Sequence, residues 1–407
     1  MDRKTFLKTS FSLGTGLLAA PAAGAGVWGS GAFSASLNEE AGRGAKVPLS
    51  ILFTGDTHAR YAPFPATAGP LAGLGGLERR AAYIEAVRAT GRHVLLLDTG
   101  DFLDSRTAAM EPFGAAEVFG WMERLGYDAA VPGNHDLQAL MGSQEWPISS
   151  LPLLLSNYRY NDKVSELKER LHEYRVKEYG GIKVGLFGLG PDLSPLAAPG
   201  SALREGLAHR SPRYLAESMV RRLRRIEGCD LVICLSHLGY APGDWRSRQR
   251  GRAYSSQSGK AIEAGSASNG HGSASGSGDG EGVSPHTGYG ILQEELALFQ
   301  DPPADARRTW AHTAGQREKV QRPGSEVAAQ YDIGLARRVE GIDLILGGHT
   351  HTFMNRPTVV QNPGGGTTTI AHTGHGGAYI GRIDLDLSRT KGKARRKFVS
   401  AELKEIS

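Results

Sequence analysis

The residues of this 407-residue chain that could do chemistry gather in five short blocks, each directly after an apolar run. Every block carries nitrogen or oxygen donors suited to a divalent cation: carboxylates, imidazoles and one amide. None offers a thiolate, which argues against a structural zinc site built on cysteines. The blocks contain the candidate metal ligands Asp56, His58, Asp101, Asn134, His237, His349 and His351, and the candidate proton donor His135.

The apolar runs before these blocks have the length and composition of buried strands. They alternate with segments of helical periodicity, which predicts a layered α/β fold with a parallel or mixed sheet. Ligands of such sheets collect beyond the carboxyl ends of the strands. Because all five blocks follow predicted strands, we expect their side chains to meet in one site. The runs are 49–53, 93–97, 129–131, 231–235 and 342–346, and the clearest helices are 77–87 and 115–125.

The number of candidate ligands indicates more than one ion. Seven residues are too many for one tetrahedral centre, but they suffice for two ions about 3.5–4 Å apart if one carboxylate bridges them. Imidazole, carboxylate and amide donors suit Zn, Mn or Fe. We therefore expect two divalent metal ions as cofactors.

The ordered motifs resemble those of the calcineurin-like metallophosphoesterase superfamily, and within it the catalytic domain of the 5′-nucleotidase branch. The resemblance covers about 48–239 and 326–390. It implies a four-layer α/β/β/α sandwich of mixed sheets flanked by helices. The motifs are Asp56-Thr57-His58, Gly100-Asp101, Gly133-Asn134-His135-Asp136, His237 and Gly348-His349-Thr350-His351.

The same resemblance implies a role for each candidate residue. Asp56, His58 and His351 would hold one ion, Asn134, His237 and His349 the other, and Asp101 would bridge them. The implied enzyme is a dinuclear-metal phosphoesterase that hydrolyses nucleotide-like phosphate esters with a metal-bridged hydroxide. His135 would assist by donating a proton to the leaving group.

Two departures from the nucleotidase pattern matter. Gln138 stands three positions after His135, where the branch usually has an aspartate that supports the histidine. The supporting carboxylate is therefore expected to be missing or to come from elsewhere. The chain also stops at Ser407, just past the catalytic motifs, so we expect no counterpart of the base-binding domain of two-domain nucleotidases, and nucleotide specificity does not carry over.

Other functions remain open on the sequence alone. The substrate could be a cyclic phosphodiester or a sugar nucleotide, and Tyr61, Phe64, Arg106 and Trp146 lie in loops near the motifs, where they could line a pocket or simply pack. A different class is a non-catalytic, metal-dependent phosphate-binding protein of the cell envelope. A nucleic-acid adhesin would rest only on the basic segment 391–397.

The chain divides into three kinds of segment. Residues 1–35 have the charged start, soft apolar stretch and small residues of an export signal, similar to a twin-arginine signal with Lys4 in place of the second arginine. Residues 47–239 and 326–407 form the expected catalytic domain, in which the closing runs after 358 are predicted to be antiparallel strands. Between them, 240–325 is a low-complexity insertion, partly disordered because its Ser/Gly-rich tract cannot form a core.

Composition limits the partners. The formal charge is only +5, and aromatic and basic residues do not interleave, so no nucleic-acid partner is expected. The leader is too rich in glycine for a stable membrane span, and no obligatory protein partner is evident.

Cys229 and Cys234 would lie about 16 Å apart on a strand, too far for a disulfide, which needs roughly 7 Å or less between α-carbons. We expect a small phosphoester as ligand and an exported protein, periplasmic or extracellular.

Overall fold

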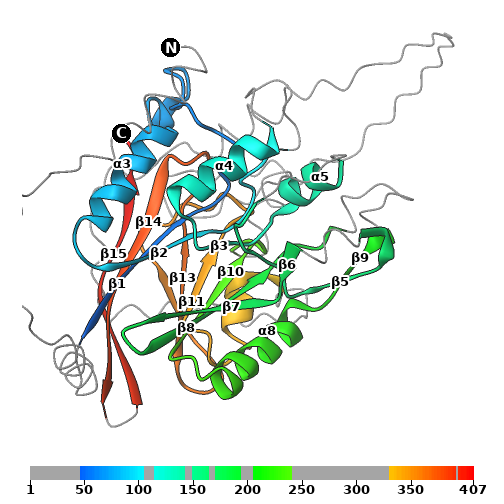
Figure 1. The fold of residues 1–407 in the computed structure, drawn as a ribbon, viewed down its shortest axis with the longest axis vertical. Helices are drawn as coiled ribbons and strands as arrows, with labels where there is room; N and C mark the ends of the chain where they lie inside the picture. The colour runs from blue at the N-terminus through cyan, green and yellow to red at the C-terminus, as the bar shows by residue number, and fades with distance from the viewer. Residues whose placement is uncertain are drawn as a thin grey trace, which may run out of the picture. The chain divides into compact units, whose positions relative to one another are not determined.

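Two mixed β-sheets lie against each other at the centre of the computed structural model (Figure 1). The structure describes residues 46–104, 114–142, 149–164, 170–193, 205–240, 330–390 and 393–407. The expected export signal lies outside these residues, and so does almost all of the expected insertion. The structure therefore leaves both as predictions.

The first sheet has the strand order β15-β14-β1-β2-β3-β4-β6. Its strands from β1 to β6 are parallel, and β14 runs antiparallel to β1 and β15. These strands are β1 (Val47–Thr54), β2 (His93–Asp98), β3 (Ala129–Ala130), β4 (Leu153–Leu154), β6 (Leu171–His172), β14 (Tyr379–Thr390) and β15 (Lys393–Glu405).

The second sheet has the order β12-β13-β11-β10-β8-β7. Its strands are β7 (Tyr174–Tyr179), β8 (Ile182–Leu189), β10 (Leu231–Ser236), β11 (Leu344–Gly347), β12 (Thr358–Gln361) and β13 (Thr367–His372). The expectation that every closing strand is antiparallel is wrong for β13, which pairs parallel with β11 and antiparallel with β12. A separate pair consists of β5 (Tyr158–Tyr160) and β9 (Leu207–His209).

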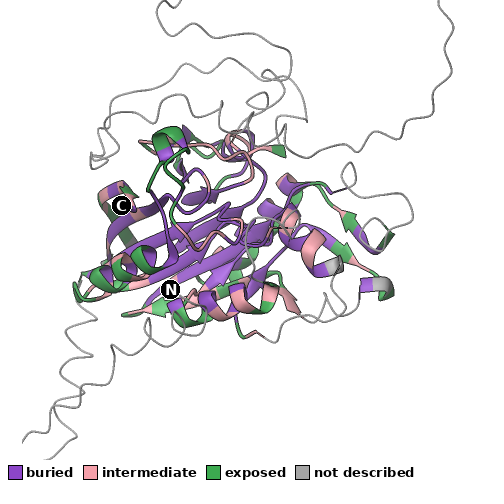
Figure 2. Ribbon diagram, turned by 90° about the horizontal axis from the view of Figure 1, so that it is seen from above, coloured by how far each residue is buried: buried purple, intermediate pink, exposed green. Residues whose placement is uncertain are grey.

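Alternation along β1 shows how sequence produces the layers. Leu49, Ile51 and Phe53 face the second sheet and join the core between the sheets, whereas Leu52 faces the helices. Successive side chains of a strand point to opposite faces, so a strand that is buried on both faces reads as a continuous apolar run. Figure 2 shows the central strands of both sheets buried, with exposed positions on the helices, the loops and the edge strands.

Helices cover the outer face of each sheet. Helices α3 (Leu77–Arg88) and α4 (Ala115–Leu125) pack on the first sheet, and α8 (Pro212–Arg221) and α10 (Asp332–Ala336) on the second. The α/β/β/α sandwich expected from the sequence is therefore confirmed. The helix predicted at 115–125 has the predicted bounds because Gly126, left-handed at φ 71°, ends it. Helix α8 continues as a π-helical turn, η3 (Arg222–Ile226).

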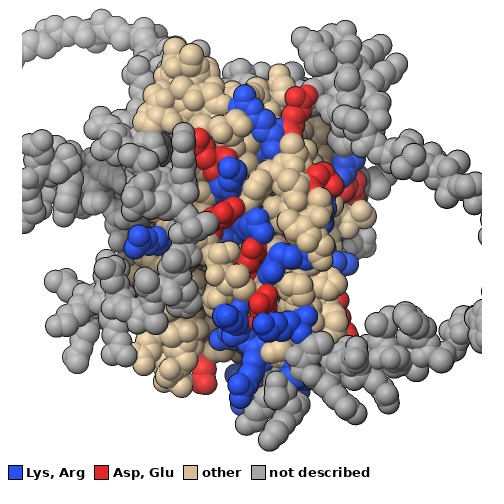
Figure 3. Space-filling model, turned by 90° about the vertical axis from the view of Figure 1, so that its left-hand side faces the viewer, with Lys and Arg blue, Asp and Glu red and all other residues tan. Residues whose placement is uncertain are grey.

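Charged side chains of both signs form pairs rather than one basic area. Figure 3 shows positive and negative groups interspersed over much of one face. Arg396 on β15 pairs with Asp343, and Arg389 on β14 lies 2.5 Å from Asp230. Part of the positive charge near the segment 391–397 is thus neutralised locally.

Both cysteines are free and buried, as expected.

The two described ends of the expected insertion lie together. The amide of Asp332 donates to the carbonyl of Gly239 at 2.9 Å, and that of Ile333 to Tyr240 at 3.1 Å. The chain thus leaves the second sheet after β10 and returns to the same place at α10. Closing this gap requires only a short connection.

We therefore predict that replacing residues 243–327 with a short Gly/Ser linker leaves the sandwich folded. A shorter connection lowers the entropy cost of closing the loop, and no described strand is removed. Thermal unfolding followed by circular dichroism should stay cooperative, with the midpoint shifted by no more than about 2–4 °C, the equivalent of roughly 1 kcal/mol in a domain of this size. An aggregated product, or one without a cooperative transition, would show that the insertion belongs to the folding unit.

Candidate metal centre

The seven predicted ligands lie at the carboxyl ends of five strands in two sheets. Strands β1, β2 and β3 are neighbours in the first sheet, and β10 and β11 are neighbours in the second. The sheets pack together, so the loops after these strands meet at one edge of the sandwich. Asp56 and His58 follow β1, Asp101 follows β2, Asn134 follows β3 as the first residue of α5 (Asn134–Gly142), His237 follows β10, and His349 and His351 follow β11.

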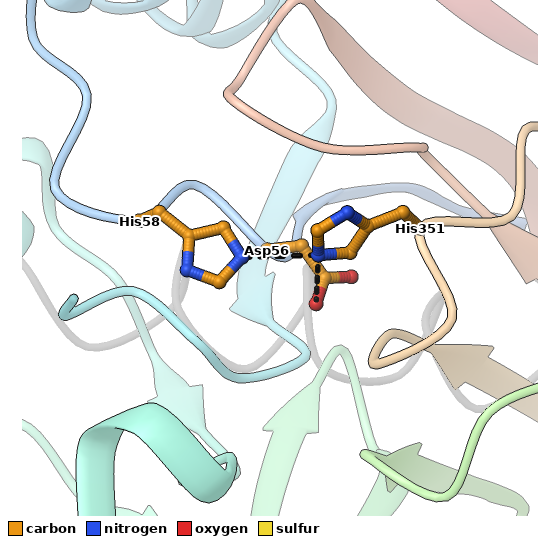
Figure 4. Close-up of side chains that lie close together, drawn as sticks. All are labelled: Asp56, His58 and His351. Carbon is orange, nitrogen blue, oxygen red and sulfur yellow. Dashed lines mark hydrogen bonds and ion pairs between the residues drawn. The ribbon is translucent and has the colours of Figure 1, made fainter. Parts of the chain in front are cut away.

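The first group of donors consists of Asp56, His58 and His351 (Figure 4). The Nε2 atoms of His58 and His351 lie 3.0 Å apart, and His351 Nε2 lies 3.7 Å from Asp56 Oδ1. Both carboxylate oxygens of Asp56 also accept from the backbone amide of His349 at 3.0 Å. One cation could contact all three side chains.

The second group consists of Asp101, His237 and His349, joined by Asn134. His237 Nε2 lies 3.1 Å from Asp101 Oδ2, and His349 Nδ1 lies 2.9 Å from the side-chain oxygen of Asn134. The other oxygen of Asp101 accepts from the amide of His135 at 2.8 Å. All seven predicted ligands are therefore brought together in two adjoining groups.

The orientation of His237 fits a metal ligand. Its Nδ1 lies 2.7 Å from the carbonyl of Thr99, so Nδ1 carries the hydrogen. In a neutral ring the buried Nε2 then has a bare lone pair that faces an oxygen of Asp101, with no hydrogen-bond donor among the described residues. Two lone pairs at this distance need a positive charge between them. Metal-bound histidines characteristically donate their other ring nitrogen to a carbonyl in this way.

The pKa shifts describe the same crowding of charge without a cation. Burial acts to lower the pKa of His237, but the Asp101 carboxylate outweighs it and raises that pKa to about 10. Burial, reinforced by repulsion from His237, lowers the pKa of His349 to about 4. Burial also raises the pKa of Asp56 well above its usual value. A divalent cation would stabilise Asp56 and Asp101 as carboxylates and His349 as a neutral imidazole.

The backbone is strained where the ligands are. Six non-glycine residues in the described part of the chain have positive φ. Five of them are predicted ligands, and the sixth, Ala59, follows His58. This conformation costs an L-residue about 1 kcal/mol or more and persists only where surrounding contacts enforce it. The five are Asp56 (50°), His58 (48°), Asp101 (52°), His349 (77°) and His351 (51°).

Backbone hydrogen bonds between the loops enforce that conformation. The amides of Asp56 and His58 donate to the carbonyls of Gly100 and Asp101, both at 2.8 Å. The amide of Gly348 donates to the carbonyl of Ser236 at 2.9 Å. Loops from different strands therefore hold one another in place.

Asp136 has an anchoring role that the sequence did not reveal. Its buried carboxylate accepts from the backbone amides of Asp101, Leu103 and Gly133, each at 2.7 Å. It thereby ties the loop after β2 to the start of α5. The sequence marked Asp136 only as part of a motif, because the backbone amides that it binds are specified by the tertiary fold.

Asp104 is the second residue that sequence reasoning missed. Its Oδ1 lies 3.8 Å from Nδ1 of His135, and the two form a third group of donors with His58. The carboxylate near His135 thus comes from the loop after β2. Gln138, which stands where the branch usually has the supporting aspartate, does not provide it. The signal that could have revealed it is its place three residues after Asp101 at the same strand end.

Two of the four suggested pocket residues lie in the described part. Phe64 is 8% exposed, lies under the guanidinium of Arg60 and contacts the ring of His375 edge-on. Tyr61 packs near Trp121. Both are therefore engaged in packing. His375, which the sequence did not single out, stacks on His351 with 4.8 Å between ring centroids. Arg106 and Trp146 lie outside the described residues.

Glycine at position 133 allows the loops to approach. A methyl group there would collide with the Asp101 carboxylate and with Nε2 of His237. We predict that Gly133→Ala lowers the affinity for Mn²⁺ by at least about tenfold, as loss of a ligand's support typically does. Calorimetric titration of the metal-free protein would measure it. Gly120→Ala in helix α4 is the control, because a methyl there meets only the flexible end of Arg124. Equal affinities of the two variants would contradict this account of the loops.

Comparison with known proteins agrees with this geometry. A snake venom 5′-nucleotidase from Gloydius brevicauda is 31% identical over 218 residues, covering 51% of this chain and 35% of the relative. A 5′-nucleotidase from Vibrio cholerae is 29% identical over 214 residues, covering 48% and 36%. The chain thus spans about a third of the length of these relatives. A 5′-nucleotidase precursor from Thermus thermophilus shares the fold, with a TM-score of 0.55 and 21% identity over 88% of this chain and 55% of that one.

Among the described residues, no helix is both long and apolar enough to cross a membrane.

The family model for calcineurin-like phosphoesterases matches residues 49–253, half of the chain, and covers four of the five strand-end blocks. The resemblance indicated by the motifs is therefore confirmed, and this chain belongs to the calcineurin-like phosphoesterase family.

Proposed function

We propose that this protein is a metal-dependent phosphoric ester hydrolase that acts on nucleotide-like substrates. The observation that carries this proposal is the convergence of two donor groups, Asp56/His58/His351 and Asp101/His237/His349, beside His135. The 5′-nucleotidases among its relatives support the substrate class. Their names also support an exported protein, in keeping with the expected signal at 1–35.

The two donor groups would hold two divalent cations. When bound, such ions supply Lewis acidity to a phosphoryl oxygen and a water of lowered pKa as nucleophile. Asp101 is placed to serve both ions. Burial acts to raise its pKa, but attraction to His237, His58 and His135 holds it well below its usual value. His58 and His237 belong to different donor groups, and both attract the Asp101 carboxylate, which supports a bridging role for it.

His135 is the residue placed to move a proton. Its side chain is partly exposed while its backbone amide is bound to Asp101. Asp104 lies on the Nδ1 side of the ring, with 3.8 Å between Asp104 Oδ1 and His135 Nδ1. A carboxylate in this position can fix the orientation of the imidazole ring. We infer that His135 protonates the leaving-group oxygen and that Asp104 orients it.

Asp101→Asn tests the metal-dependent activity. We expect wild-type protein with Mn²⁺ to release phosphate from a nucleoside monophosphate or to cleave bis(4-nitrophenyl) phosphate, and EDTA to abolish both. The Asp101→Asn variant should lose bound metal and turnover together, because an amide cannot bridge two cations as a carboxylate does. Metal content by mass spectrometry and phosphate release are the measurements.

Asp162→Asn, a change to an exposed carboxylate away from the donor groups, is the matched control. An Asp101→Asn variant that stays fully active and still binds two ions would sink the bridging assignment. Wild-type protein that binds metal and phosphate but cleaves none of several mono- and diesters would instead favour the non-catalytic phosphate-binding class.

His135→Ala and Asp104→Asn test the proton donor. For a poor leaving group such as a nucleoside, His135→Ala should lower kcat by roughly 10²–10⁴-fold, while metal content stays near that of the wild type. The loss should be much smaller for 4-nitrophenolate, which leaves without protonation. Asp104→Asn should show the same leaving-group dependence with a smaller loss.

The double variant should be little worse than His135→Ala alone, because residues that act as one unit are not additive. Additive losses, or equal losses for both leaving groups, would show that Asp104 does not act through His135.

A further inference from the structure

A buried polar cluster lies behind the metal centre, under the ends of three strands of the second sheet. It consists of Ser236 at the end of β10, Asp332 at the start of α10 and His372 at the end of β13. Ser236 and Asp332 are fully buried and His372 is 1% exposed. None of the three belongs to the predicted ligand set. We call them the Asp332 cluster.

Hydrogen bonds within the cluster satisfy the carboxylate of Asp332. Oδ1 accepts from the hydroxyl of Ser236, and Oδ2 lies 2.8 Å from Nε2 of His372. Nε2 therefore carries the hydrogen, while Nδ1 of His372 is buried without a hydrogen-bond partner among the described residues. A buried carboxylate is costly unless its oxygens are bonded. If packing were the only role of these three positions, apolar side chains would fill them without this cost.

The cluster contacts both strand ends that carry histidine ligands. Ser236 directly precedes His237, its hydroxyl accepts from the amide of Leu238 at 3.2 Å, and its carbonyl accepts from Gly348 at 2.9 Å. On β11, a methyl group at Gly347 would collide with His372 and Asp332. Gly347 is two residues before His349, so the cluster touches the backbone beside each of these two ligands.

We propose that Asp332 is a positioning residue for the metal centre. It fixes the strand ends that aim His237 and His349, and its negative charge behind them favours a divalent cation in front. Within a protein interior such a charge acts through a lower dielectric than water. This inference rests on the proposed function, because it presupposes that the two histidines bind metal.

The test is the metal affinity of Asp332→Asn. Asparagine keeps the shape and can still accept from Ser236, but it removes the charge. We expect Mn²⁺ and Zn²⁺ to bind about 10–100-fold more weakly, the usual effect of losing a residue that supports a ligand. Competition with a chelator measures the affinity, and thermal unfolding of the metal-free protein measures stability separately.

Asp343→Asn is the matched control. Asp343 is another buried carboxylate, 4% exposed. It lies directly before the first residue of β11, whereas the Asp332 cluster lies at Gly347, the last residue of that strand. It bonds Arg224, Arg396 and the amide of Val232. Its replacement should lower the unfolding temperature but leave the metal affinity at the wild-type value. Equal losses of affinity in the two variants would overturn the proposal, because they would report general destabilisation.

His372 gives a second comparison that does not alter Asp332. The amide of His372→Gln can still donate to the carboxylate, whereas His372→Leu cannot. The glutamine variant should bind Mn²⁺ more tightly than the leucine variant, and equal affinities would count against the proposal even if Asp332→Asn does not fold.

These results separate the two levels of inference. Wild-type protein that binds no divalent metal would refute the proposed function itself. Wild-type protein that binds metal, with Asp332→Asn binding equally well, would refute only the role of Asp332.

Discussion

Mutual repulsion among crowded electron-pair donors is the constraint on which this structure depends. Ring nitrogens of His58 and His351 lie 3.0 Å apart, and His237 Nε2 lies 3.1 Å from a carboxylate oxygen. Such contacts are unfavourable unless a positive charge lies between them, whether a proton or a cation. The fold holds these donors together, an arrangement that favours a bound cation. In the proposed function, bound cations would then attract the phosphoryl oxygens of a phosphate ester.

The sandwich makes that crowding possible. Three apolar cores, one between the sheets and one under each layer of helices, hold the five strands rigid. The strain of left-handed residues such as Asp56 and His349 is then imposed by the strands on which their loops begin. Glycines remove the side chains that would keep the loops apart, as Gly133 does between Asp101 and His237. Packing within the layers thus offsets the strain at their common edge.

The proposed acid–base function would be shared between loops rather than contained in one motif. His135 comes from the start of α5, while the carboxylate near it, Asp104, comes from the loop after β2. Asp136 joins these two loops by binding three backbone amides. The absence of a carboxylate at Gln138 therefore does not leave the histidine without one. The Asp332 cluster is a corresponding support on the side of the second sheet.

The sequence by itself determined the layered fold, the strands and the candidate ligands, because these depend on local periodicity and on which residue types follow each apolar run. It predicted the bounds of α4, but it missed short strands such as β6 and the parallel pairing of β13, which depend on neighbours distant in the chain. Which donors share a group was implied by the family resemblance, and the tertiary structure brings the same residues together. The tertiary structure alone placed Asp104 beside His135, although the two are 31 positions apart in the sequence. It also placed Asp332 near the strand end that carries His237, although these two are 95 positions apart. No local pattern encodes the packing of two sheets that brings such residues into contact.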